Sequence, residues 1–310
     1  MQKKILKLLK CGRRLSEIVI NTFYYYRVRH CGVIVINAWI RLHKTKVING
    51  NWGDALNYFF LKEIVGGSIV NYSDLLHRYL HLGITNIMCI GSIVDWSRIT
   101  KNSIIWGSGA MYGGDIPLKE KPMKVCAVRG PLTREYLLSK GVDCPEIYGD
   151  PALLLPRIYR PVVPLKKYKI GVIPHYSDLQ NKYVLEFLER ENGNIKLIDL
   201  RHYSDWHEVI DMINECEFII SSSLHGLIVA DAYNVPNVWV EFSDNVEGDG
   251  FKFRDYFASV KREAYIPLRI ENYMQIDELM VYKDVWKPIQ FDVGKLIAAC
   301  PFKIHIFSNL

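Results

Sequence analysis

The chain has 310 residues, enough for two α/β domains, and its 49% hydrophobic and 23% charged residues exclude an intrinsically disordered protein. Seven cysteines form no Cys-x-x-Cys pair, which indicates free thiols in a reducing compartment rather than a structural zinc site. The formal net charge is +6, but residues 1–46 hold eleven basic residues and one acidic residue, so the remainder is net acidic. Because the basic residues gather at one end without a recognisable motif, we expect no nucleic-acid partner.

Residues 1–30 are expected to form a basic amphipathic N-terminal extension. An aromatic run at 23–26 follows a helical segment whose basic side is formed by Lys3, Lys7, Lys10 and Arg14. Segments of this kind bind anionic lipid surfaces. No uncharged stretch reaches the roughly 20 apolar residues of a transmembrane helix, and no signal-peptide cleavage site follows. A helix that packs against the fold is the alternative.

The first half of the chain alternates strands with helices. A helix runs on from residues 56–61 to a glycine pair, and another is expected at 132–139. Strands are expected at 33–36, 68–70, 86–90, 103–106 and 124–128. This alternation predicts a mostly parallel, doubly wound sheet. The proline-containing stretch 156–164 is the expected linker.

The second half repeats the pattern. Strands are expected at 168–173, 195–200, 218–220 and 238–240, and helices at 182–191, 206–215 and 224–233. We therefore expect an α/β fold of two Rossmann-like domains that face a cleft. Their predicted bounds are 31–160 and 165–310, with closing segments that cross back to the first domain.

Two polar clusters lie where a hydrophobic run ends and a helix begins, at 51–57 and 221–227. Free backbone N–H groups and the positive helix end point outward at such turns, which is where open α/β sheets hold ligands. Asp54 in the first cluster is either the helix cap or a general base. Asn51, Trp52 and Asn57 around it are expected to contact sugar hydroxyls.

The second cluster combines His225 with the hydroxyls of Ser222 and Ser223. Such a turn can hold a phosphate or carboxylate, and an imidazole there can donate a proton to the bound molecule. The alternative is that a serine caps the helix and the imidazole packs within the turn.

Further candidates for an anion site follow other strands. Arg129 ends a strand before Gly130-Pro131, and His175 lies between a strand and Asp178. Lys252 and Arg254 are cations in an aromatic stretch near the end. Each also fits an ordinary ion pair or surface charge.

Several catalytic motifs are absent from the sequence. There is no Asp-x-Asp, His-Glu-x-x-His, P-loop or Gly-x-Ser-x-Gly. We therefore expect chemistry without a metal and without a resident cofactor.

Five segments resemble the polysaccharide pyruvyl transferase family in order and spacing. They are 51–57, 127–133, 147–152, 171–176 and 216–236. Residues 251–257 are similar to the branch acting on exopolysaccharides and capsules. The resemblance covers about 33 to 260 and leaves residues 1–30 outside.

The resemblance implies a glycosyltransferase-B-like pair of domains, the first on the acceptor side and the second on the donor side. It implies transfer of the enolpyruvyl unit of phosphoenolpyruvate onto two hydroxyls of one sugar, which forms a cyclic ketal. Arg129 and His225 match donor-site positions, and Asp54 matches an acid of the first motif. Many members have arginine where this chain has Ser223, so Lys252 or Arg254 is expected to supply the charge.

The family also implies a lipid-linked glycan acceptor at the inner face of the plasma membrane, so we expect a cytoplasmic, peripheral enzyme. Two other functions stay open. A metal-independent glycosyltransferase using a nucleotide sugar would share the fold and release a nucleoside diphosphate. A non-catalytic glycan-binding protein would release no phosphate.

Overall fold

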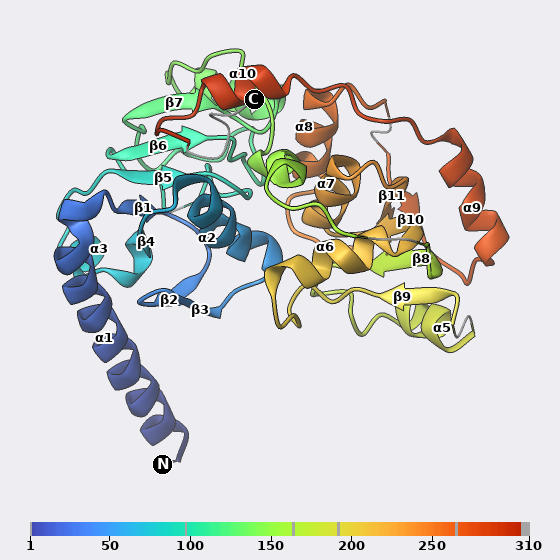
Figure 1. The fold of residues 1–310 in the computed structure, drawn as a ribbon, viewed down its shortest axis with the longest axis horizontal. Coiled ribbons are helices and arrows are strands. Elements are labelled where there is room, and N and C mark those ends of the chain that lie inside the picture. The colour runs from blue at the N-terminus through green and yellow to red at the C-terminus, as the bar shows by residue number, and fades with distance from the viewer. Residues whose placement is uncertain (1, 97, 163–164, 191–192, 264–265, 305–310) are drawn as a thin grey trace.

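The computed structural model describes residues 2–96, 98–162, 165–190, 193–263 and 266–304, and it contains two parallel sheets in separate halves (Figure 1). The first sheet has the strand order β4-β1-β5-β6-β7. Its strands are β1 (Ile34–Ile36), β4 (Ile69–Asn71), β5 (Asn86–Met88), β6 (Ser103–Trp106) and β7 (Lys124–Ala127). Its helices are α2 (Trp52–Val65), α3 (Leu76–Tyr79) and α4 (Pro131–Ser139), and short 3-10 turns are η1 (Arg29–Cys31), η2 (Tyr72–Asp74) and η3 (Pro151–Arg157).

The second sheet has the order β12-β11-β10-β8-β9. Its strands are β8 (Tyr168–Ile173), β9 (Ile195–Leu197), β10 (Cys216–Ser221), β11 (Asn237–Glu241) and β12 (Leu268–Arg269). The helices of this half are α5 (Lys182–Arg190), α6 (Trp206–Asn214), α7 (Leu224–Ala232), α8 (Phe251–Ser259), α9 (Ile276–Val285) and α10 (Val293–Ala298). The expected α/β class with parallel sheets is confirmed.

Both sheets are wound in the same way. The first strand of each, β1 or β8, is followed by an edge strand on one side, and the chain then crosses to the other side. The winding reverses between β1 and β5 in the first sheet and between β8 and β10 in the second. At such a reversal the loops leave in opposite directions and open a crevice at the carboxyl ends of the strands.

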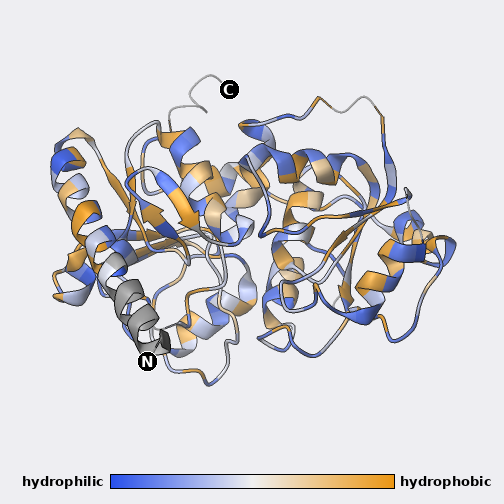
Figure 2. Cartoon of the chain, turned by 90° about the horizontal axis from the view of Figure 1, so that it is seen from below, coloured by the Kyte–Doolittle hydropathy of each residue, from blue (hydrophilic) through white to orange (hydrophobic). Residues whose placement is uncertain are grey.

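The strands are short and apolar because helices cover both faces of each sheet. Figure 2 shows hydrophobic strands in both halves between helices of mixed hydropathy, as expected for parallel sheets. The predicted strand 33–36 is observed as β1 (Ile34–Ile36). An antiparallel ribbon of β2 (Arg41–His43) and β3 (Lys46–Asn49), which was not predicted, precedes α2. After β1 the Asn37 side chain donates to Asn86 Oδ1 at 3.1 Å and to the Arg98 carbonyl at 2.9 Å, and the chain bends at Trp39.

A buried ion pair joins the two halves. Asp255 of α8 accepts a hydrogen bond from Arg129 Nε at 3.0 Å, and both side chains have no exposed surface. Thr133 of α4 donates to the same carboxylate from its backbone N–H and its hydroxyl, at 2.8 and 2.7 Å. Gly130 permits this approach, because a Cβ there would lie 1.9 Å from the Asp255 carbonyl oxygen.

The start of α2 forms a second contact between the halves. Trp52 donates from its backbone to Leu200 O at 2.8 Å and from its indole to Trp206 O at 2.9 Å. The closing residues also reach the first sheet, since the Trp106 indole of β6 donates to Leu296 O at 2.9 Å. Figure 1 shows α10 beside β6 and β7 accordingly.

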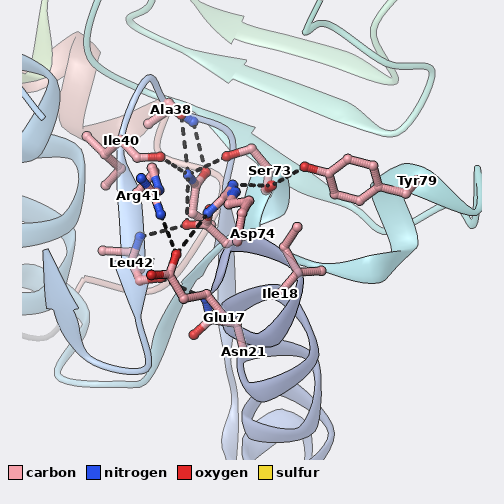
Figure 3. A network of polar contacts seen from close by, with 12 residues as sticks. Glu17, Ile18, Asn21, Ala38, Ile40, Arg41, Leu42, Ser73, Asp74 and Tyr79 are labelled. Atoms are coloured by element: carbon pink, nitrogen blue, oxygen red, sulfur yellow. Dashed lines mark hydrogen bonds and ion pairs between the residues drawn. The ribbon is translucent and has the colours of Figure 1, made fainter. Parts of the chain in front are cut away.

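Helix α1 (Gln2–Val28) packs on the first half through its second part (Figure 3). Asp74 is 1% exposed and accepts from Arg14 at 2.6 Å and from the Leu42 backbone at 2.7 Å. Asn21 is bonded to Leu42 O, and Glu17 pairs with Arg41. The helix from Arg14 onward is therefore part of this half, while its first turns project away (Figure 1).

The predicted basic face formed by Lys3, Lys7 and Lys10 lies outside the described side chains, which exclude those of residues 1–11 and 13. Within the described part of the chain, no helix has the length and apolar character to cross a membrane.

Replacing Asp255 by alanine should lower the free energy of unfolding by about 3–5 kcal/mol, because it leaves the Arg129 guanidinium buried without a counter-charge. Chemical denaturation would measure the change. In the neighbouring Arg254→Ala, the lost guanidinium bonds the Asp249 carbonyl alone among the described residues, so stability should change by less than about 1 kcal/mol. Equal stabilities for the two variants would contradict a central role for this pair.

Candidate active site

The two sheet reversals face one another across a small cavity of about 130 Å³. Its walls come from the residues that follow the four reversal strands: Trp39 after β1, Ser92 after β5, His175 after β8, and Ser223 and His225 after β10. Lys252 of α8 completes it. The topology predicts one crevice at the reversal of each sheet. The two crevices face each other and form this single cavity.

A larger cavity of about 910 Å³ adjoins the small one. Trp39, Asn51, Asp54 and Tyr176 line both cavities. The larger cavity extends from this shared wall toward the β2–β3 ribbon and α1. Two ligands, one bound in each cavity, would therefore come together at Asp54.

His225 lies in the first turn of α7 against the start of α2. A Cβ on Gly53 would lie 2.1 Å from His225 Nδ1, so only glycine leaves space for the ring. The Nε2 atom is buried with no hydrogen-bond partner among the described residues. Burial and the charges of Lys252 and Arg129 lower the His225 pKa to about 3. The imidazole is therefore neutral in the free protein and has an unused polar atom.

Lys252 supplies a buried cation to the same cavity. It is 6% exposed, and no described carboxylate lies within ion-pair distance of its ammonium group. Burial, with a contribution from Arg129, lowers the Lys252 pKa to about 8. Ser223, at the start of α7, makes no cap hydrogen bond, so the helix terminus is open. An uncapped helix terminus beside an ammonium group that has no described ion-pair partner is a candidate anion site, and Glu247 is a carboxylate in the same lining.

Asp54 lies in the first turn of α2, but it is not the cap. Asn51 fills that role, since its Oδ1 accepts from the Gly53 backbone at 3.0 Å. Desolvation raises the Asp54 pKa to about 7, although Arg98 and Lys252 oppose the shift. A carboxylate with that pKa at the junction of two cavities is suited to act as a general base.

His175 also lines the small cavity. Its Nδ1 is 2.7 Å from the Ser177 hydroxyl, and burial together with Lys252 lowers its pKa to about 4. Ser222 lies behind it and does not line the cavity. Its hydroxyl accepts from the His175 backbone and donates to Asp178, both at 2.8 Å. Ser222 therefore positions the loop, which corrects its expected role as a direct donor contact.

Two predicted anion ligands do not reach the cavity wall. Arg129 uses its three nitrogens on Asp255, Ser92 and the Ala110 carbonyl, so it acts on the cavity through its charge. Arg254 is turned toward the Asp249 carbonyl, 2.6 Å away. Between the two candidates expected to replace an arginine at Ser223, the structure brings only Lys252 to the cavity.

Two predicted acceptor contacts belong to the core instead. Trp52 has no exposed surface and is bonded to the second half of the chain. Asn57 is 1% exposed, and its amide is bonded to Ile90 and to the Asp54 carbonyl. Hydrogen bonds hold both side chains in the core, Trp52 to the Trp206 carbonyl and Asn57 to the backbone of Ile90.

The sequence interpretation missed residues of the larger cavity. Trp39 is 49% exposed and lines both cavities, and its ring lies 4.1 Å from the Arg98 guanidinium. The sequence signal for Trp39 was an aromatic residue at the carboxyl end of an expected parallel strand. Arg98 follows no motif, so no sequence signal pointed to it.

A family model described as polysaccharide pyruvyl transferase matches residues 64–244. The uncharacterized protein L143 of Acanthamoeba polyphaga mimivirus is 30% identical over 221 residues, which are 69% of this chain and 73% of that protein. The succinoglycan biosynthesis protein ExoV of Rhizobium meliloti (strain 1021) is 28% identical over 227 residues, 72% of this chain and 65% of ExoV. The matched range of the family model contains His175 and His225 and ends before Lys252.

The imidazole of His225 should stay neutral down to about pH 4 in the free protein, because its surroundings are buried and positively charged. Nitrogen-15 NMR of histidine-labelled protein would record the titration, with His225→Asn to identify the resonance. Adding inorganic phosphate should raise this pKa, because a bound anion stabilises the imidazolium. Titration near pH 6.5 without phosphate would contradict the described environment.

Proposed function

Because this chain belongs to the polysaccharide pyruvyl transferase family, we propose that it transfers the enolpyruvyl unit of phosphoenolpyruvate onto two hydroxyls of a sugar in a polysaccharide repeat unit. The product is a cyclic pyruvate ketal, and phosphate is released. The similarity to a succinoglycan biosynthesis protein supports an exopolysaccharide acceptor. The observation that carries the proposal is the small cavity, which is lined by Asp54, by Lys252 without a described ion-pair partner, and by His225, whose Nε2 has no described hydrogen-bond partner.

The small cavity suits the donor. Phosphoenolpyruvate has a phosphate, a carboxylate and three carbons, and it needs cations and open N–H groups rather than a large groove. Lys252, Ser223 and the start of α7 supply these. A volume of about 130 Å³ favours this donor over a nucleotide sugar. The larger cavity is then the acceptor side.

The donor and acceptor sides support the proposed domain division. Residues 31–160 contribute most of the larger cavity, and residues 165–310 contribute His175, Ser223, His225 and Lys252 to the smaller one. We propose that the halves form a glycosyltransferase-B-like pair with the reaction centre between them.

Asp54 and His225 divide the proton transfers in the proposed reaction. A sugar hydroxyl oxygen bonds to the central carbon of the donor while Asp54 takes the hydroxyl proton. His225, protonated once the anionic donor is bound, gives a proton to the methylene carbon, which becomes methyl. The carbon–oxygen bond to phosphate breaks, and phosphate leaves with the proton from Asp54. The second hydroxyl bonds to the same carbon and returns its proton to His225.

The proposed chemistry predicts a bell-shaped dependence of activity on pH. Activity should rise as Asp54 loses its proton near pH 7 and fall as Lys252 loses its charge near pH 8. Asp54→Asn and His225→Ala should each lower turnover by roughly 10²–10⁴-fold, the usual range for a lost acid–base group. The assay follows phosphate release and the mass of the pyruvylated product from phosphoenolpyruvate and a panel of lipid-linked glycans.

A matched control is Asp244→Asn, an exposed carboxylate on the second half, which should leave turnover unchanged. Near-normal turnover in a folded His225→Ala protein would remove His225 from the mechanism. Release of a nucleoside diphosphate from a sugar donor would favour a glycosyltransferase. Binding of glycan without phosphate release would favour a non-catalytic protein.

We further propose that α1 holds the enzyme at an anionic membrane surface, where a lipid-linked acceptor is concentrated. Large apolar side chains are exposed on α1 and beside α3, namely Leu15, Phe23, Leu80 and Leu82. Together with the basic N-terminal residues they form the two components of an interfacial anchor. Each basic residue near such a surface contributes about 1 kcal/mol of attraction.

Deleting residues 2–12 tests this anchor without disturbing the Asp74 network, which begins at Arg14. The truncated protein should lose binding to anionic liposomes at low salt, because most of its basic residues on α1 are removed. Its activity on a soluble acceptor should be retained. Full-length protein that fails to sediment with such liposomes would contradict the membrane role.

A further inference from the structure

His175 lines the small cavity, but it has no step in the proposed reaction. It lies two residues after the end of β8, at the reversal of the second sheet, and its side chain is half-buried. Its ring centroid is 4.1 Å from that of the neighbouring Tyr176. Burial and the charge of Lys252 lower the His175 pKa to about 4. The ring is therefore uncharged at neutral pH, and only one of its nitrogens carries a proton.

The contacts of Nδ1 decide which nitrogen of His175 carries the proton. The Ser177 backbone N–H donates to His175 Nδ1 at 3.4 Å, and a backbone N–H can only donate. The Ser177 hydroxyl lies 2.7 Å from the same nitrogen. Nδ1 is therefore an acceptor, and the proton of the neutral ring is on Nε2. No described residue forms a hydrogen bond with Nε2, so this N–H group is left for a ligand.

A closed set of hydrogen bonds fixes the His175 loop in place. The His175 backbone N–H donates to Ser222 Oγ at 2.8 Å, and the Ser222 hydroxyl donates to Asp178 Oδ2 at 2.8 Å. The Asp178 backbone N–H donates back to the His175 carbonyl at 2.8 Å. Asp178 and Ser222 have no exposed surface. The Nε2–H group is thus held in position before a ligand binds, as electrostatic catalysis requires.

The two histidines of the small cavity differ in what they can donate. In the proposed reaction His225 becomes an imidazolium once the anionic donor is bound, and it protonates carbon. His175 stays neutral, because a proton added at Nδ1 would oppose the Ser177 backbone N–H that points at this nitrogen. A neutral imidazole is too weak an acid to protonate carbon, but its N–H can donate a hydrogen bond to an oxygen that becomes negative.

We infer that His175 is a catalytic residue whose Nε2–H donates a hydrogen bond to the departing phosphate, at the oxygen that joins it to the central carbon. The inference rests on the proposed function. When the carbon–oxygen bond breaks, its electron pair goes to this oxygen, and the second sugar hydroxyl then bonds to the carbon. The phosphate takes the proton from Asp54, and His175 keeps its own. Charge on the oxygen grows only as the bond breaks, so the hydrogen bond is stronger in the transition state than in the bound donor.

Two amides of different length at position 175 are the first test. The amide nitrogen of glutamine lies near the place of Nε2, whereas that of asparagine lies near the place of Nδ1. His175→Asn should lower kcat by roughly 10²-fold, as the loss of one such donor does, and leave the KM for phosphoenolpyruvate within about threefold. His175→Gln should restore most of the lost kcat. His202→Gln, an exposed histidine outside both cavity linings, is the matched control and should leave kcat unchanged.

An isotope effect connects the loss to the bond that breaks. With oxygen-18 at the linking oxygen of phosphoenolpyruvate, the isotope effect on kcat/KM should be larger in His175→Asn than in the parent protein. Breaking of this bond limits the rate more strongly when its hydrogen-bond donor is missing. The pH dependence of activity should be the same in both proteins, because His175 does not change its protonation.

Nitrogen-15 NMR tests the contact without activity. In the free protein His175 should have a proton on Nε2 and none on Nδ1, and His175→Gln identifies the resonance. Inorganic phosphate should shift the Nε2–H signal, because the anion accepts a hydrogen bond from it. A proton on Nδ1, or a signal that does not respond to phosphate, overturns the inference.

The outcomes separate this role from the proposed function. An effect of His175→Asn on KM alone, equal kcat values in His175→Asn and His175→Gln, or an unchanged isotope effect overturns the contact with the departing phosphate while the pyruvyl transfer stands. No transfer by the parent protein contradicts the proposed function, and the phosphate titration then decides the contact at Nε2 alone.

Discussion

The buried carboxylate of Asp255 holds the two halves of the chain in one arrangement. It satisfies the Arg129 guanidinium and two donors of Thr133 without access to water. Removing one partner of such a pair leaves a charge in a medium that cannot solvate it, so the halves are not free to separate at this point. The distance between the two sheet reversals, and with it the small cavity, depends on this contact.

The same ion pair shapes the electrostatics of the site. All three nitrogens of Arg129 are hydrogen-bonded within the protein, but its charge still contributes to the lowered pKa values of His225 and Lys252. The charges of Lys252 and Arg129 therefore act on the small cavity before any ligand enters, although Asp54 and Glu247 also line it, and an anion that binds there meets groups already in position. Asp54 lines the same cavity, and desolvation keeps the pKa of its carboxyl group near neutrality. Asp74 also holds α1 against the first half through its ion pair with Arg14. Because Arg14 lines the larger cavity, α1 forms part of the wall of that cavity.

Much of the fold followed from local pattern. Apolar runs such as 168–173 and 216–221 alternate with amphipathic helices, and this period is enough to predict two parallel α/β sheets. The clusters at 51–57 and 221–227 were recognisable because polar residues after an apolar run mark a turn before a helix. The β2–β3 ribbon and the two-residue strand β12 were not predictable, since elements this short carry too few residues to establish a period.

The sequence by itself determined the class of fold and the family resemblance, and it indicated Asp54 and His225 as candidate catalytic residues, because these depend on residues close together in the chain. Only the tertiary structure decided which residues lie beside them. Trp52 and Asn57 belong to the same motif as Asp54 but face the core, whereas Lys252 reaches His225 from a different helix. Helix faces and long-range packing set these directions, and contacts between residues far apart in the chain leave no local pattern to read.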